Sequence, residues 1–133
     1  MAGGQGTRLG FNGPKGTYNL GEGINKSLFE IFSDTIKKAK EDNEAESIPW
    51  YVMTSRENNA QTMKFFKENN YFGLPENDVV FFIQGELPMV GTNGKILIDE
   101  TGIVKQAADG HGGVFAAMFR DGVVDDMKKR GIE

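Results

Sequence analysis

The sequence predicts an α/β fold with a mainly parallel sheet. Two apolar runs, IPWYVMT at 48–54 and VVFFIQ at 79–84, have the β-branched and aromatic composition of strands buried on both faces. Helical apolar patterns precede the first run and separate it from the second. Because helices and strands alternate along the chain, the strands are expected to pair in parallel. A length of 133 residues suits one domain with a single core.

The first helix follows a glycine-rich loop and is expected to begin at a cap on Asn25 and to continue to roughly Lys40. The charged segment 40–46 then reads as an exposed connection. Ser55 is expected to cap a second helix from Glu57 to about Asn69, which a turn at 71–75 ends. The residues predicted to face inward are Leu28, Phe29, Phe32, Ile36 and Ala39 in the first helix, and Ala60, Met63 and Phe66 in the second.

The second half of the chain is predicted to contain a hairpin between Gly94 and Val104, with a glycine turn at Thr101–Gly102. A glycine-rich loop at 109–113 leads into a helix near Val114, and an amphipathic stretch follows at 123–130. Only two residues precede the opening loop, and no strand follows the last helix. We therefore expect the N-terminal half of a larger catalytic domain, truncated at both ends.

The composition restricts the classes of partner. The formal net charge is −4, whereas a protein that binds nucleic acid generally presents a basic face. The absence of cysteine excludes disulfides, thiolate metal sites and cysteine nucleophiles, and it is compatible with the cytoplasm. The sequence has no signal peptide pattern and no apolar run near the roughly 18 residues of a membrane span. We expect a cytoplasmic protein without nucleic-acid or membrane partners.

The opening loop, MAGGQGTRLGFNGPKG, has the composition of a phosphate-binding loop. It does not fit the Walker pattern, because no lysine follows a glycine in the required frame. It does not fit the dinucleotide pattern G-x-G-x-x-G either, because the sixth position counted from Gly4 is Leu9. Its small residues let backbone N–H groups approach phosphate oxygens. Arg8 is able to bind two of those oxygens, and Lys15 adds a compact charge. From these residues alone, an ordinary glycine-rich turn with a solvated lysine remains an alternative.

The segment G-G-x-G-T-R with P-K downstream resembles the signature of nucleotidyltransferases that make nucleoside-diphosphate sugars. Together with IPWYVMTS, KFFKENNYFGL, VVFFIQGELP, DGHGG and VVDDMKKRGI, it resembles eukaryotic-type UDP-N-acetylglucosamine pyrophosphorylases over almost the whole chain. The resemblance implies a Rossmann-like nucleotide-diphospho-sugar transferase fold, with residues 1–133 as the UTP-binding half of the catalytic domain. It also implies a reaction, in which a sugar 1-phosphate oxygen attacks the α-phosphorus of UTP and pyrophosphate leaves.

The resemblance also implies roles for particular residues. Arg8 and Lys15 would face the triphosphate beside a Mg²⁺ ion, with no metal ligand in this chain, and Gln84 would read the uracil edge through its amide. His111 stands where many relatives have asparagine and would face the nucleotide or the sugar phosphate. The remaining residues implied to contact UTP are Ala2, Gly3 and Gly4, through their backbone, and Gly110, near the base or ribose.

Several alternatives stay open at this point. Gln84 could be a polar strand end satisfied by backbone, and His111 a loop histidine with no special role. The sugar could differ from N-acetylglucosamine, or the chain could be a non-catalytic nucleotide-binding fragment. A partner could supply the remainder of the catalytic domain. Asp125 and Asp126 are expected on a polar helix face and are not candidate metal ligands.

Overall fold

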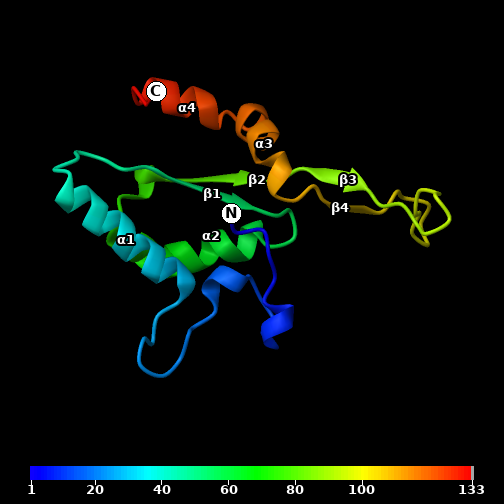
Figure 1. The fold of residues 1–133 in the computed structure, drawn as a ribbon, viewed down its shortest axis with the longest axis horizontal. Helices are drawn as coiled ribbons and strands as arrows, with labels where there is room; N and C mark the ends of the chain where they lie inside the picture. Colours follow the sequence, from blue (N-terminus) through cyan, green and yellow to red (C-terminus); the bar gives the residue numbers. More distant parts are fainter. Residues whose placement is uncertain (133) are drawn as a thin grey trace. The chain divides into compact units, whose positions relative to one another are not determined.

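The computed structural model describes residues 1–132, which form two compact units. The first unit comprises Met1–Ile83, and the second begins at Gln84. Figure 1 shows the elements of both units in chain order. The first unit contains α1 (Leu28–Asp42), β1 (Trp50–Thr54), α2 (Asn59–Glu68) and β2 (Val79–Ile83), and the second contains β3 (Glu86–Pro88), β4 (Gln106–Ala108), α3 (Val114–Arg120) and α4 (Val123–Lys129).

The strands β1 and β2 pair in parallel, with Trp50 opposite Val79 and Thr54 opposite Ile83. Helix α2 connects them, so β1, α2 and β2 form a β-α-β unit and confirm the predicted pairing. Strand β1 begins later than predicted, after Pro49. Proline has no backbone N–H to donate to a ladder, which explains why pairing starts at the following residue.

The cap of α1 lies two residues after the predicted one. Ser27 accepts a hydrogen bond from the backbone N–H of Glu30 (3.2 Å), and its own N–H donates to the Glu30 carboxylate (2.7 Å). This capping box satisfies two helix-end donors at once. The prediction of Asn25 as the cap is wrong, because this residue adopts a left-handed φ of 47° in the preceding turn.

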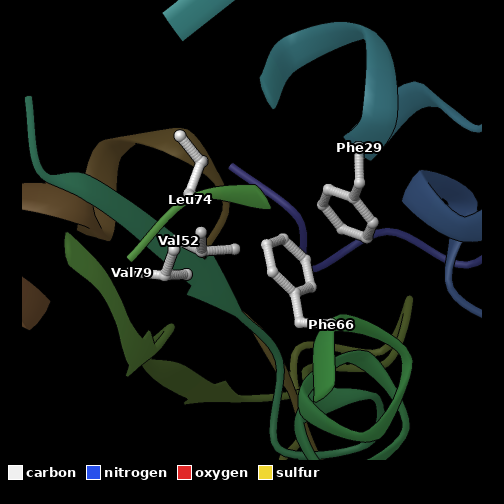
Figure 2. Packing of buried hydrophobic residues seen from close by; sticks show 5 residues of the cluster. All are labelled: Phe29, Val52, Phe66, Leu74 and Val79. Carbon is white, nitrogen blue, oxygen red and sulfur yellow. The ribbon is translucent and has the colours of Figure 1, made fainter. Parts of the chain in front are cut away.

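The core of the first unit joins both helices to both strands. Figure 2 shows Phe29 of α1 and Phe66 of α2 pointing toward each other beside Val52 of β1 and Val79 of β2, and Leu74 completes the cluster. The rings of Phe29 and Phe66 lie 4.8 Å apart between centroids at an interplanar angle of 62°. This edge-to-face contact is the geometry that aromatic pairs prefer.

The helices bury slightly different faces from those predicted. Phe32 is 52% exposed and Met63 is 44% exposed, and Ala60 is also exposed, so these three inward predictions are wrong. Ser33 and Thr62 occupy the buried positions beside Phe29 and Phe66. Both are small hydroxyl side chains, and the Ser33 hydroxyl donates to the carbonyl of Glu30 (2.8 Å).

The second unit contains the predicted hairpin as part of a longer antiparallel arrangement. Ile98 pairs with Val104, and a turn bond from the N–H of Gly102 to the carbonyl of Asp99 (3.1 Å) closes the predicted glycine turn. The ladder between β3 and β4, with Glu86 opposite Ala108, was not predicted from the sequence. It brings the two ends of the hairpin region together.

Helices α3 and α4 begin where the sequence predicts them, and Gly122 joins them with a left-handed φ of 74°. Among the described residues, none of the helices combines the length and apolar character that crossing a bilayer requires.

Candidate functional site

The opening loop is closed at its base by backbone pairing. The N–H of Lys15 donates to the carbonyl of Gly4 (3.0 Å), and the N–H of Gly6 donates to the carbonyl of Gly13 (2.8 Å). Between these two bonds, Gln5 and Pro14 form an antiparallel bridge. The loop therefore folds back on itself and brings Lys15 beside Gly4.

The start of the loop is attached to the end of β1. The N–H of Ala2 donates to the carbonyl of Met53 (2.5 Å), and the carbonyl of Ala2 accepts from the side-chain amide of Asn58 (3.0 Å). The same amide lies 3.5 Å from the carbonyl of Gly4. The carboxyl ends of parallel strands are where open α/β sheets bind ligands. The loop is thus held at the edge of the sheet where a ligand is expected.

Asn58 is the residue that sequence reasoning missed in this part of the site. It is fully buried, and its side-chain oxygen accepts from the N–H of Ser55 (2.9 Å) while the Ser55 hydroxyl accepts from the N–H of Asn58 (3.2 Å). This reciprocal pair closes the turn between β1 and α2, and α2 itself begins at Asn59, two residues later than predicted. The available signal was the spacing S-x-x-N directly after a buried strand.

The loop keeps its donors and cations available to a ligand. Within the described residues, the N–H groups of Gly3 and Gly4 donate to no carbonyl, whereas both backbone groups of Ala2 are engaged. The side chains of Arg8 and Lys15 are exposed and form no ion pair in the described part of the chain. Two adjacent N–H groups and two cations that lack partners in the described part of the chain form an arrangement suited to an anion.

The other predicted residues lie in the second unit. Gln84 directly follows β2 and is 9% exposed, and its side chain makes no hydrogen bond among the described residues. The carbonyl of Gly85 accepts from the N–H of Asp109 (2.9 Å), which extends the β3–β4 ladder. This pairing brings Gln84 alongside Gly110, although the two are far apart in sequence.

The loop after β4 has a conformation that depends on glycine. Gly110 has φ 71° and ψ −158°, a combination that is essentially restricted to glycine. His111 follows at the start of a short 3₁₀ turn and is exposed. The structure therefore groups Ala2, Gly3, Gly4 and Lys15 in the first unit, and Gln84, Gly110 and His111 in the second.

The described residues contain no cluster of three or more histidine, cysteine or acidic side chains that could hold a metal ion. Asp126 instead forms an ion pair with Arg130 (2.8 Å) on α4.

Comparison with known proteins identifies the family. A model of the family described as UTP–glucose-1-phosphate uridylyltransferase matches residues 1–133. The chain belongs to this family. Among curated proteins, it is 45% identical to a probable UDP-N-acetylglucosamine pyrophosphorylase of Schizosaccharomyces pombe, over 99% of this chain and 30% of that protein.

Solved structures agree with this assignment. The UDP-N-acetylglucosamine pyrophosphorylase of Trypanosoma brucei, crystallised with an inhibitor, superposes with a TM-score of 0.80 at 41% identity, over 89% of this chain and 24% of that one. A putative enzyme of the same name from Entamoeba histolytica gives a TM-score of 0.84 at 39% identity, over 98% of this chain and 34% of that one.

These matches confirm the predicted fold class, an α/β nucleotide-diphospho-sugar transferase fold. They also confirm the resemblance to UDP-N-acetylglucosamine pyrophosphorylases. The chain spans about 30% of the length of the curated relative from S. pombe.

Proposed function

We propose that residues 1–133 are the UTP-binding half of a nucleotidyltransferase catalytic domain. The whole protein would form UDP-N-acetylglucosamine and pyrophosphate from UTP and N-acetylglucosamine 1-phosphate. The observation that carries this proposal is the closed opening loop. Within residues 1–132, the N–H groups of Gly3 and Gly4 donate to no carbonyl, and the cations of Arg8 and Lys15 form no ion pair. Relatives named for this activity, 45% and 41% identical, support the choice of reaction.

The roles of the loop residues follow from the chemistry of phosphoryl transfer. Charge spreads over phosphate oxygens in the transition state, so catalysis depends on positioning and neutralisation and needs no protein nucleophile. In this proposal, Gly3 and Gly4 donate their N–H groups to phosphate oxygens, and Arg8 and Lys15 neutralise the charge that develops. Ala2, whose N–H and carbonyl are both engaged, contacts the nucleotide only by packing while it anchors the loop.

The second unit would supply recognition of the uridine. The Gln84 amide offers a donor group beside an acceptor group, which match the uracil edge, and its side chain has no competing partner among the described residues. Gly110 would lie close to the base or ribose because it has no side chain. His111, exposed at the start of its turn, would face the nucleotide or the sugar phosphate.

Mg²⁺ is part of the proposal as an ion that enters with the nucleotide. Magnesium in such sites is commonly held by substrate phosphates and a few carboxylates. The described residues provide no carboxylate cluster for it, so no step of this chain's chemistry is assigned to the metal.

An alternative within the same class is a different sugar 1-phosphate. The description of the matching family model names glucose 1-phosphate, which favours that sugar as the second candidate. For the isolated chain, non-catalytic nucleotide binding is a further candidate, since it covers only 24–34% of the solved relatives. The remainder of the catalytic domain would then be its partner. A cytoplasmic location without membrane or nucleic-acid partners is also part of the proposal, and the net charge of −4 supports the lack of nucleic-acid partners.

A thermal-shift titration of the 133-residue chain with UTP and Mg²⁺, with ATP in place of UTP as control, tests the proposal. If the chain folds and reads uracil, UTP raises the melting temperature and ATP does not. At 100 times the dissociation constant, linkage predicts about 2.7 kcal/mol of stabilisation. A cooperative transition that is insensitive to both nucleotides would contradict nucleotide binding by this chain.

A further inference from the structure

The carboxyl group of Asp109 lies between two glycines from different segments of the second unit. Gly85 directly follows Gln84, and Gly113 ends the short turn that leads into α3. A Cβ atom added to either glycine would overlap the Asp109 carboxyl group. The side chain therefore occupies the space that both glycines leave empty, and only glycine fits on either side of it.

The same residue is also bonded to one of these neighbours through its backbone, because its N–H donates to the carbonyl of Gly85 (2.9 Å). Its Oδ1 atom is buried and has no hydrogen-bond partner among the described residues. Burying a carboxylate oxygen without a partner is unfavourable, and such groups in native proteins call for an explanation. The side chain makes no hydrogen bond among the described residues, so its fit between the two glycines and its attraction to the Arg120 side chain of α3 hold it in place.

The position of this side chain suggests that explanation. On one side of it lies Gln84–Gly85, and on the other lies the loop that carries Gly110 and His111. We propose that Asp109 is a positioning residue for uridine recognition, acting as a wedge that sets the distance between Gln84 and the loop 110–113. This inference rests on the proposed function and adds to it a residue that touches no substrate.

Variants that change either the volume or the charge of the Asp109 side chain distinguish a role based on shape from one based on charge. Asparagine has nearly the same size and would fill the same space, so Asp109→Asn keeps the wedge while removing the charge. Asp109→Ala removes the wedge. Gly113→Ala adds a Cβ where the carboxyl group lies, and this clash is relieved when Asp109 is also changed to alanine.

The experiment measures binding of UTP and of inorganic tripolyphosphate to the 133-residue chain and these variants by calorimetry, with melting temperatures recorded alongside. Asp109→Ala is expected to weaken UTP binding roughly tenfold or more, because small displacements of positioned groups can reduce their effect by this factor or more. Tripolyphosphate, which would bind the loop of the first unit, should keep its affinity. Asp109→Asn should stay within about threefold of the original chain for both ligands, the scale of a small packing change.

The double variant Asp109→Ala/Gly113→Ala should bind UTP no worse than Gly113→Ala alone, since the added Cβ then meets no carboxyl group. If Asp109→Ala does not fold, Asp109→Ser replaces it as the variant with a shortened wedge.

Three results with the variants would overturn the inference while leaving the proposed function intact. The first is unchanged UTP affinity in Asp109→Ala. The second is an equal loss of UTP and tripolyphosphate binding, which would indicate a general structural role. The third is an Asp109→Asn variant as weak as Asp109→Ala, which would indicate a role for the charge. If the original chain binds no UTP, the proposed function itself fails and this inference fails with it.

Discussion

The side-chain amide of Asn58 donates a hydrogen bond to the carbonyl of Ala2 over a distance of 3.0 Å, although 56 positions separate the two residues in sequence. Asn58 is fully buried and stands in the turn between β1 and α2. Its bond fixes the first turn of the opening loop to the β-α-β unit. The geometry of the candidate phosphate site therefore depends on a residue outside the glycine-rich motif.

Asn58→Asp should destabilise the chain while changing its shape very little. The substitution replaces a donor by a carboxylate oxygen that faces the carbonyls of Ala2 and Gly4. An unpaired buried charge of this kind is expected to lower the free energy of unfolding by about 2–4 kcal/mol. Urea denaturation of both proteins at pH 7 measures the difference.

Asn93→Asp is the matched control for that substitution. The Asn93 side-chain oxygen accepts from the N–H of Lys95 (3.0 Å) at an exposed site, and a carboxylate oxygen accepts the same bond. Its free energy of unfolding should change by less than about 0.5 kcal/mol. If Asn58→Asp changes the free energy of unfolding as little as Asn93→Asp does, the bond between Asn58 and Ala2 has no structural importance.

The fold was largely predictable because its strongest signals are local. The runs 48–54 and 79–84 predicted two parallel strands, and the first helix needed only its periodicity to be located. Local signals failed where two of them competed. Asn25 and Ser27 are both good caps, and only the glutamate three residues after Ser27 makes the capping box that decides between them.

Lys15→Ala should weaken UTP binding without unfolding the chain. The Lys15 side chain is exposed and forms no ion pair in the described region, so its removal leaves the packing intact. Loss of one charged hydrogen bond to phosphate is worth about 1.5–3 kcal/mol of binding free energy. Calorimetry with UTP measures the loss.

Lys64→Ala serves as control for that experiment, because Lys64 is an exposed lysine of α2 that pairs with Glu68 at 3.6 Å. It should leave UTP affinity unchanged. The free energy of unfolding without UTP decides between the two roles. If Lys15→Ala lowers it by as much as it lowers the free energy of UTP binding, Lys15 is a structural residue and its assignment to the ligand is wrong.

Gly4→Ala should separate ligand binding from folding. A Cβ atom added at Gly4 has no neighbour within 4 Å, so the free energy of unfolding should change by less than about 0.5 kcal/mol. A phosphate oxygen bound to the Gly4 N–H would meet that Cβ, and UTP affinity should fall. Thermal shifts with and without UTP measure both effects in one series.

Gly16→Ala is the contrasting variant. Its added Cβ would overlap the ring of Phe29 in the core, and overpacking of this kind destabilises by about 1–3 kcal/mol. The melting temperature of Gly16→Ala should therefore already be lower than that of the original chain in the absence of UTP. If Gly4→Ala binds UTP as tightly as the original chain, the backbone of Gly4 does not contact the nucleotide.

Other parts of the site could not be predicted because they depend on contacts distant in sequence. The ladder that brings Gln84 beside Gly110 consists of strands of three residues each, too short for a periodicity signal. The contact of Asp109 with Gly85 and Gly113 leaves no mark in the sequence beyond the glycines themselves. Sequence motifs located the candidate residues, and the residues that hold them in position appeared only in three dimensions.

Asp34→Asn should reduce stability in a pH-dependent way. Asp34 on α1 pairs with Lys26 (2.6 Å) and Lys37 (2.8 Å). Hydrogen bonds from Lys26 and then Lys37 hold the pKa of Asp34 below its ordinary value of 3.8. A carboxylate with a lowered folded pKa contributes stability above its unfolded pKa and loses that contribution as the pH falls through the folded value.

At pH 7 the difference in unfolding free energy between the original chain and Asp34→Asn should be below about 1 kcal/mol, because the Asp34 side chain is 40% exposed and its pairs are screened by solvent. Urea denaturation between pH 7 and pH 3 should show the difference shrinking below pH 4, and added salt should reduce it at pH 7. Asp42→Asn on the same helix removes a more exposed pair with Lys38 and should have a smaller effect at pH 7. A difference for Asp34→Asn that is constant from pH 7 to pH 3 would mean that the charge of Asp34 does not stabilise the fold, since only protonation of a stabilising carboxylate removes its contribution in acid.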